Sequence, residues 1–422
     1  MFRSLRFAFA ILFVLSFLSP AMSEDWPGWR GPRGDGSSVD KNLPVEWDGE
    51  SQKNVKWKSP IDGYSHSSPI VWKDRIFVVS CVKESTERVL ISLDRKTGAV
   101  IWQKPVLKAP LEKLHKLNSH ASGTPVTDGK LIYVTFLEAD FGSSNKTTPG
   151  NMVVAAFDFE GKQKWLVRPG RFSSVHGFCT SPIIFKDKLI VNGDHDGDAY
   201  IAALHRETGE TIWKVKRENK TRSYVTPIVR EIDGRTQMIL SGSKCIASYD
   251  PNDGERHWII DGPTQQYVAS MVYNGEFLFM TAGFPERHIL AIRPNGTGNV
   301  TDTHVEWRTT KACSYVPSPV ISGDHFLVAA DNGVCSCFDA ASGDRLWMER
   351  LGKHYSASLV EANGLVYFTA DDGIVKVIRP GKELDVVAEN NLGEYVFASP
   401  AISDGQLFIR GENHLFCIEK KK

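Results

Sequence analysis

Short apolar runs of four to six residues recur along the whole chain, each bounded by Gly, Asp, Asn or Pro. Many come in pairs that follow a Ser-Pro or Thr-Pro step, as in IFVV after Ser68-Pro69 and LIYV after Thr124-Pro125. Apolar runs of this length between turn residues are typical of β-strands. Helical periodicity is almost absent, so the pattern predicts an all-β protein.

The strands belong to a repeated unit. An apolar strand, then Asp-x-x-Thr-Gly or a close variant, then a Trp four residues after the Gly, occurs at 90–102, 201–213, 246–258 and 335–347, with a shortened copy at 155–165. Strand-rich repeats of about 40 to 50 residues are typical of β-propellers. The Trp column consists of Trp57, Trp102, Trp165, Trp213, Trp258, Trp307 and Trp347, and one further step of 40 residues reaches Val387. A second column opens eight units at Ser68, Thr124, Ser181, Thr226, Ser270, Ser318, Ser358 and Ser399. We therefore predict eight blades.

The two ends of the repeat array complement each other. The last unit stops one strand short of a blade, whereas the strand that carries Trp57 has no blade in front of it. Closing the ring removes the unpaired strand edges that an open array would expose. We predict that this N-terminal strand completes the eighth blade beside the strand that ends at Ile418, so that residues 55–418 form one propeller domain.

The repeated residues have structural roles that need no ligand. A turn Asp accepts backbone N–H bonds, and the Gly supplies the positive φ of a tight hairpin. The Trp column is predicted to pack between adjacent blades. If Trp213 is fully buried, its replacement by Ala costs about 3 to 5 kcal/mol.

The N-terminal residues resemble an export signal. Arg3 and Arg6 precede an apolar run, and small residues follow it at the positions expected before a cut at Glu24, so residues 1–23 are predicted to be a cleaved signal peptide. Since no Cys follows the cut, we expect a periplasmic or secreted protein without a lipid anchor or a membrane span.

Residues 24–54 carry Trp26, Trp29 and Trp47 among many Gly and Pro. We interpret them as a strap docked on the propeller, with an exposed partner-binding tail as the alternative.

Composition narrows the classes of partner. The 50 Lys and Arg balance the 50 Asp and Glu, which leaves no net field for nucleic acid or an anionic membrane. The seven Cys are an odd number, so at least one is unpaired. Cys335 and Cys337 are expected to be packing residues, with a metal or redox pair as the alternative.

Two insertions in the second blade, 105–120 and 138–151, are expected to be irregular surface additions and the place for blade-specific function.

An aromatic or imidazole residue precedes the first strand of each blade. Because first strands line the channel of a propeller, these residues are expected to ring one mouth of it and to form a candidate ligand site. They are His66, His120, His176, Tyr224, Tyr267, Tyr315, Tyr355 and Tyr395. The three imidazoles could hold a metal, and the ring could bind a polar or aromatic ligand. The alternative is that these side chains simply plug the channel.

Calcium-binding and catalytic motifs have little support in the sequence. The run Asp194-His195-Asp196-Gly197-Asp198 has the oxygen density of a Ca²⁺ loop, but it lacks the Glu that an EF-hand needs at its twelfth position. A hairpin turn is the favoured interpretation. The chain has no nucleophile elbow, phosphate loop or HExxH motif, so no catalytic residue and no metal site is predicted.

The repeat pattern SSP-I/V, DG-IYV, DDG, LD-x-x-TG-x-x-x-W resembles the quinoprotein-like propellers, the family named for the pyrroloquinoline quinone (PQQ) repeat. The segments DWPGWRGPRGDGSS at 25–38 and ASPAISDGQLFIRGENHLFCI at 398–418 resemble a subgroup of secreted bacterial propellers. In that family, PQQ dehydrogenases add a vicinal Cys pair, a Trp floor under the quinone, a Ca²⁺ site and a catalytic Asp. Here no two Cys are adjacent, and no Trp outside the structural column aligns with that floor. The chain is also similar to the propeller lipoprotein that assists outer-membrane protein assembly, although it lacks the lipid-bearing Cys.

These observations predict a non-catalytic propeller that acts as a monomeric scaffold for a protein or a ligand, with another protein or a cell-envelope component as its partner. No cofactor is expected, because PQQ and Ca²⁺ lack their motifs. Two alternatives remain open. One is a PQQ- or metal-dependent oxidoreductase that uses the channel mouth, and the other is a carbohydrate- or polymer-binding propeller that uses the insertions of the second blade.

Overall fold

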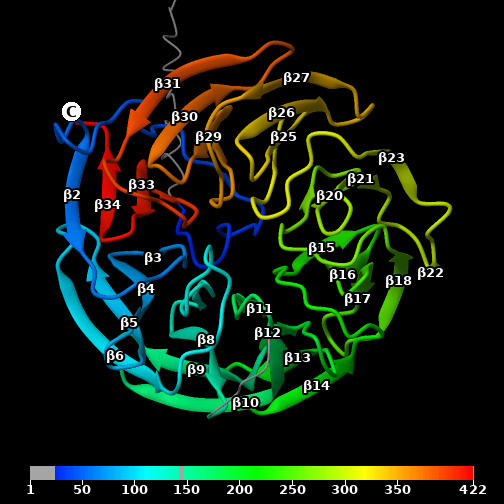
Figure 1. Cartoon of the computed structure of the whole chain (residues 1–422), viewed down its shortest axis with the longest axis horizontal. Helices are drawn as coiled ribbons and strands as arrows, with labels where there is room; N and C mark the ends of the chain where they lie inside the picture. Colours follow the sequence, from blue (N-terminus) through cyan, green and yellow to red (C-terminus); the bar gives the residue numbers. More distant parts are fainter. Residues whose placement is uncertain (1–23, 142–146, 422) are drawn as a thin grey trace, which may run out of the picture.

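The computed structural model describes residues 24–141 and 147–421, so the predicted signal peptide lies outside the described residues. All regular elements of this part are β-strands, arranged as eight sheets in a ring around a central channel (Figure 1). The prediction of an eight-bladed β-propeller is confirmed. Within the two described ranges, no helix is long and apolar enough to cross a membrane.

The first four blades follow the chain from the inner to the outer strand. Blade one contains β3 (Ile70–Trp72), β4 (Arg75–Val82), β5 (Glu87–Asp94) and β6 (Val100–Lys108). Blade two contains β7 (Val126–Thr127), β8 (Leu131–Ala139), β9 (Thr148–Asp158) and β10 (Gln163–Ser174). Blade three contains β11 (Ile183–Phe185), β12 (Lys188–Gly193), β13 (Tyr200–His205) and β14 (Thr211–Lys216). Blade four contains β15 (Ile228–Ile232), β16 (Arg235–Gly242), β17 (Cys245–Tyr249) and β18 (Arg256–Asp261), with β22 (Gly298–Asn299) added in parallel outside β18.

The remaining blades have the same order. Blade five contains β19 (Val272–Tyr273), β20 (Leu278–Ala282), β21 (His288–Ile292) and β23 (Val305–Thr309). Blade six contains β24 (Val320–Ser322), β25 (His325–Ala329), β26 (Val334–Asp339) and β27 (Arg345–Arg350). Blade seven contains β28 (Val360–Ala362), β29 (Leu365–Thr369), β30 (Ile374–Arg379) and β31 (Asp385–Asn391), with β1 (Ser37–Ser38) added inside β28. Blade eight contains β32 (Ala401–Ser403), β33 (Gln406–Arg410), β34 (His414–Glu419) and β2 (Val55–Pro60).

The ring closes through the N-terminal strand β2. It pairs antiparallel with β34 in the eighth blade, and Trp57 lies opposite Cys417. The last repeat unit supplies three strands and the N-terminus supplies the fourth, so both otherwise unpaired edges are used. The predicted closure is confirmed.

Six of the seven Trp side chains of the column donate a hydrogen bond from the indole, five to the next blade and one within its own blade. In five of them the indole Nε1 donates to a carbonyl in the turn between the third and fourth strands of the next blade, and the ring covers the glycine of that turn, as Trp57 covers Gly98. The donor and acceptor distances are 3.0 Å for Trp57 to Arg95, 2.9 Å for Trp102 to Phe159, 3.0 Å for Trp165 to Arg206, 3.2 Å for Trp213 to Pro251 and 3.1 Å for Trp307 to Ala340. The sixth, Trp258, is fully buried and donates to Gln237 Oε1 of its own blade at 2.8 Å.

Residues 24–54 form a strap across one end of the channel. Trp26 pairs with Val71 of blade one, the Pro27 carbonyl accepts from Thr127 N of blade two at 2.8 Å, and β1 pairs with β28 of blade seven. Trp26 is 1% exposed and Trp47 is 3% exposed. The strap appears in dark blue inside the ring of Figure 1. The channel is therefore covered on this side, which we call the strap face.

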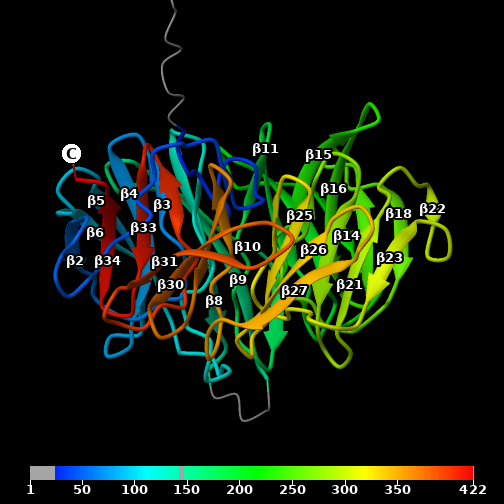
Figure 2. The ribbon, with the colours of Figure 1, turned by 90° about the horizontal axis from the view of Figure 1, so that it is seen from above.

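The opposite side of the ring, which we call the well face, carries the connections between blades and the turns between second and third strands. In Figure 2 the strap lies at the top and the β8–β9 hairpin projects from the bottom. This hairpin corrects one expectation, because the insertion at 138–151 is not wholly irregular. Its outer parts lengthen β8 and β9, with Ala139 opposite Gly150, and residues 105–108 of the other insertion extend β6.

Candidate functional site

The central channel contains a cavity of about 400 Å³ that opens on the well face. Trp29 of the strap closes its inner end, and the indole Nε1 donates to Ser270 Oγ at 3.1 Å. From the sequence, Trp29 was expected only within a docked segment, and no pattern placed it in the channel. The cavity is therefore a blind well, with an indole as its floor and the connections between blades as its walls.

Hydroxyl groups from the first strands form a girdle around the well. They come from the Ser/Thr column, in which the backbone N–H of one blade donates to the hydroxyl of the next blade. The distances are 3.1 Å for Ser68 to Thr124, 2.9 Å for Thr124 to Ser181, 2.9 Å for Ser270 to Ser318, 2.9 Å for Ser318 to Ser358 and 2.8 Å for Ser358 to Ser399. These bonds satisfy inner-strand N–H groups that have no ladder partner, so the repeated hydroxyl has a structural role that the sequence analysis did not assign.

The structure separates the eight predicted mouth residues into two groups. His66, His176, Tyr224 and Tyr315 line the well. The other four do not line it. The ring of His120 faces the Glu112 carbonyl, Tyr267 and Tyr355 are fully buried, and Tyr395 is 57% exposed and lies outside the cavity wall. The expected ring of eight around the mouth is thus corrected to four. The reason is the variable offset to the Ser-Pro step, because a shift of one residue turns the side chain to another side of the loop.

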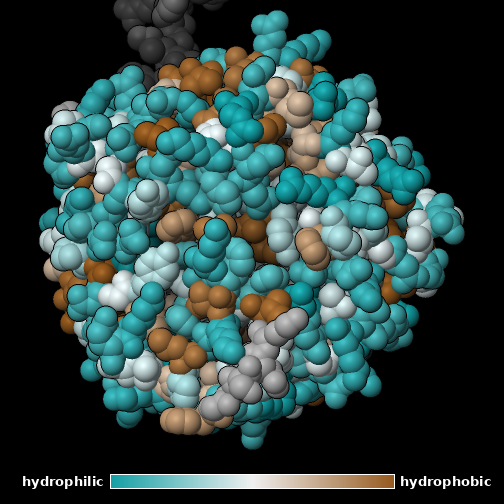
Figure 3. All heavy atoms as spheres, viewed as in Figure 1, coloured by the Kyte–Doolittle hydropathy of each residue, from teal (hydrophilic) through white to brown (hydrophobic). Residues whose placement is uncertain are grey.

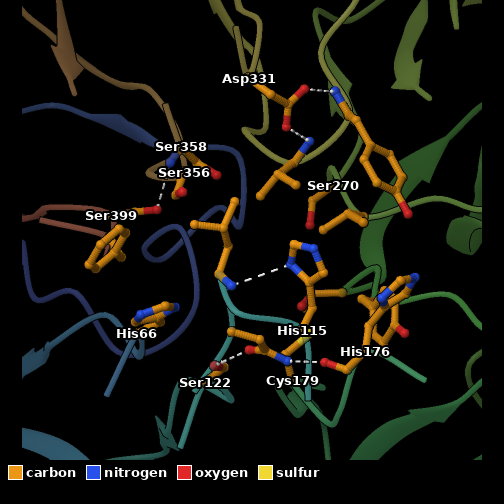
Figure 4. A pocket seen from close by; sticks show the side chains of 18 of the residues that line it. His66, His115, Ser122, His176, Cys179, Ser270, Asp331, Ser356, Ser358 and Ser399 are labelled. Carbon is orange, nitrogen blue, oxygen red and sulfur yellow. Dashed lines mark hydrogen bonds between the residues drawn. The ribbon is translucent and has the colours of Figure 1, made fainter. Parts of the chain in front are cut away.

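Neighbouring residues occupy the places of three of the four that are missing. His354 lines the well beside the buried Tyr355, and Phe397 lines it beside Tyr395, whose ring stacks on Phe397 at 6.4 Å. His115 takes the place expected for His120. Figure 4 shows His66, His115 and His176 on separate loops around the same space.

His115 reaches the well because the first insertion of blade two bends over the channel. The Asn118 amide donates to the His176 carbonyl at 2.7 Å, and the His115 ring packs edge-on against the His176 ring at 5.7 Å. The insertion is fixed at its base by Arg88, which pairs with Glu112. The length of the insertion was visible in the sequence, but its direction was not.

Burial favours the neutral form of two of the imidazoles that line the well, those of His66 and His176. Burial lowers the pKa of His66 to about 4, and its ring stacks on Phe397 at 4.6 Å while Nε2 lies 2.9 Å from Tyr64 Oη. Burial also lowers the pKa of His176 and raises that of Tyr315 to about 12. At neutral pH the side chains of His66, His176 and Tyr315 are therefore polar but uncharged.

Asp331 in the wall of the well and Asp371 next to that wall hold the loops that border the well. Asp331 accepts from the backbone N–H groups of Tyr315 at 2.9 Å and Val316 at 3.0 Å. Asp371 accepts from Ser356 N at 2.7 Å, and its Oδ2 lies 2.6 Å from His354 Nδ1. Burial raises the pKa of Asp371. Each aspartate thus orders the connection that leads into its own blade and borders the well.

This donor set does not fit a metal ion. Among the residues that the structure describes, no three His, Cys, Asp or Glu side chains are grouped to hold one. His66, His120 and His176, considered together in the sequence analysis, do not converge. In the Asp194–Asp198 run, Asp194 is buried and its Oδ1 pairs with Arg217 Nε at 2.9 Å, so an arginine occupies the place that a cation would need. All seven Cys, each within the described ranges, are free thiols, and Cys335 and Cys337 are buried in blade six.

The fold and the well define the class: a closed eight-bladed propeller with a blind central cavity on one face. A family model described as "Outer membrane protein assembly factor BamB" matches residues 38–138, 85–281 and 285–385. The chain belongs to this family, which confirms the resemblance to PQQ-repeat propellers.

Individual relatives are more distant. A curated BamB of Burkholderia pseudomallei (strain K96243) is 32% identical over 114 residues, which are 26% of this chain and 29% of that protein, so the match spans less than a third of the relative. The crystal structure of BamB from Moraxella catarrhalis superposes with a TM-score of 0.61 and 13% identity, over 86% of this chain and 99% of that one. A europium-containing methanol dehydrogenase superposes with a TM-score of 0.65 and 13% identity, over 93% and 90%. These structures share the fold.

Proposed function

We propose that the chain is a non-catalytic scaffold propeller of the bacterial cell envelope that binds a partner protein through its well face. The observation that carries the proposal is the family match across residues 38–385, because the family is described as an outer-membrane protein assembly factor. In this proposal the mature protein acts outside the cytoplasm, as a monomer and without a cofactor.

The geometry of the well supports a binding surface. Asp331 and Asp371, which would be the first candidates for acid or base chemistry, are engaged in bonds that order the surrounding loops. Trp29 closes the far end, so the well presents one entrance and a preformed shape. Preformed concave sites with mostly apolar walls and a few polar groups are typical of binding sites.

Affinity purification from the native host tests this proposal. The full chain, tagged at its C-terminus, is crosslinked briefly in intact cells and recovered from the envelope fraction. We expect one envelope protein in a fixed molar ratio to the chain. A variant with the exposed rim residues altered, Leu117→Asp with Tyr395→Ser, should lose that protein, whereas Ile101→Ser on the outer strand β6 should retain it. Equal recovery with the rim variant, or fractionation of the mature chain with the cytoplasm, contradicts the proposal.

A further inference from the structure

Large apolar side chains stand exposed around the entrance of the well. Leu117 is 40% exposed, Phe284 is 51% exposed and Tyr395 is 57% exposed. They come from three separate connections, those between β6 and β7, β20 and β21, and β31 and β32. Figure 3 views this face and shows apolar side chains around a central hollow. Apolar surface that is gathered around a cavity marks a site of interaction.

The apolar surface extends beyond the well itself. Phe284 and Tyr395 lie outside the cavity wall, whereas Leu117 and Phe397 form part of it. A small molecule confined to about 400 Å³ would leave the outer rim in water. A chain segment that crosses the rim and inserts one large side chain would cover both, which favours a protein partner over a small ligand.

The charge at the entrance indicates the composition of that segment. Arg287 lines the well, is exposed, and makes no hydrogen bond or ion pair with any residue in the described ranges. Asp331 of the wall, and Asp371 behind His354 of the wall, are committed to backbone N–H groups. Glu286 lies beside His288 at 3.6 Å. His66, His176 and Tyr315 of the wall are uncharged at neutral pH. A guanidinium at the edge of such a surface favours a carboxylate on the partner.

We propose that the well face binds an acidic, extended segment of the partner protein, in which an aromatic or large aliphatic side chain enters the well and a neighbouring carboxylate pairs with Arg287. This inference rests on the proposed scaffold function and specifies the chemistry of its partner. The Trp29 floor and the Phe397 wall provide the contacts for the inserted side chain, and the girdle of hydroxyls gives the well its fixed shape.

Peptide selection on the intact mature protein tests the inference. A random dodecapeptide phage library is selected on the immobilised full chain, and the enriched peptides are synthesised and titrated by fluorescence anisotropy. We expect enriched sequences that place Asp or Glu within two residues of Phe, Trp, Tyr or Leu. Arg287→Glu should weaken their binding by about tenfold or more, because a favourable charge pair becomes a repulsive one.

Matched variants keep the test specific. Arg308→Glu makes the same charge change on the outer strand β23, and it should alter binding less than about twofold. Equal binding by the Arg287 and Arg308 variants, or enrichment of sequences without the acidic and apolar pair, overturns the inference. Stronger binding of free indole-3-acetate than of the peptides also overturns it, because the well would then be a small-molecule site.

The two proposals can fail separately. If the envelope partner is recovered with the wild-type chain and lost with the rim variant, but the selected peptides ignore Arg287, the scaffold function stands and the acidic segment is wrong. If no partner is recovered and no peptides are enriched, both are wrong.

Discussion

Arg88 and Glu112 form an ion pair that is sealed inside the protein. Arg88 Nη2 donates to Glu112 Oε2 at 2.8 Å, and the two side chains are 0% and 1% exposed. The same guanidinium donates to the carbonyls of Ala109 at 2.6 Å and Leu137 at 3.3 Å. One residue of strand β5 therefore fixes the insertion that carries His115 over the well.

Replacing Arg88 by Met should destabilise the protein by about 3 to 5 kcal/mol, because it leaves a buried carboxylate and several buried carbonyls without their donor. Urea denaturation measures the change. Arg75→Met on strand β4 is the matched control, since Arg75 is only partly buried, and it should cost less than about 1 kcal/mol. Similar losses in both variants would contradict the role of the pair.

The Arg88→Met variant should also be more sensitive to alkali than the parent. Burial raises the pKa of Glu112, and the Arg88 charge opposes that rise. A carboxyl whose pKa is higher in the folded state stabilises the fold at low pH, and that contribution is lost as the pH rises through the folded-state pKa. Without Arg88, unfolding free energies at pH 5 and pH 8 should therefore differ more than they do in the parent. An unchanged difference would show that Glu112 is not buried as described.

His66 should contribute to acid sensitivity. Its pKa falls to about 4 in the folded protein, from an ordinary value near 6.5, because burial disfavours the imidazolium. The unfolded chain then takes up the proton first as the pH falls, so stability is lost between about pH 6.5 and about pH 4, by as much as about 3 kcal/mol.

The variant His66→Phe tests this contribution, because it keeps the stacking on Phe397 and removes the titrating group. Its unfolding free energy should decline less than that of the parent between pH 7.5 and pH 4.5. Parallel curves for the two proteins would mean that His66 titrates normally in the folded state.

The Trp residues of the column should contribute unequally to the free energy of unfolding. The Trp258 side chain is fully buried, with 0% exposed to solvent, whereas Trp213 is only partly buried. Trp258→Ala should cost about 3 to 5 kcal/mol, and Trp213→Ala should cost clearly less. The larger cost was expected for Trp213 only if it is fully buried, and in the structure it is partly exposed. Thermal unfolding of both variants checks the order, and a larger loss for Trp213 would contradict it.

The strap should resist trypsin in the native protein. Arg30 is 2% exposed, and its Nη1 donates to the Ser318 carbonyl at 3.3 Å, so the bond after it is not accessible. Cleavage between residues 30 and 41 should therefore be slow, as followed by intact mass. Trp26→Ala, which removes a 1% exposed indole, should make it fast. Rapid cleavage of the parent would show that the strap is not docked.

The parts of this molecule that repeat were predictable, and the parts that occur once were not. Blade number and closure followed from the spacing of the Trp column and from the missing strand beside Ile418, because each blade is specified by local turn and strand residues. The placement of His115 and Trp29 in the well depended on how two irregular segments cross the channel. Tyr355 and His354 differ by one residue, yet one is buried and the other lines the well, a distinction that periodicity cannot make in a loop.

Site-specific photocrosslinking in intact cells of the native host tests the central claim, that the well face binds a partner protein. Benzoylphenylalanine is placed at Phe284 and Tyr395 around the well, and at Ile101 and Val386 on the outer strands β6 and β31, all of which are exposed. The account predicts a discrete protein adduct from the two well-face positions and little from the outer strands. Adducts that form only from Ile101 and Val386 would contradict it and would place the partner on the outer edge of the ring.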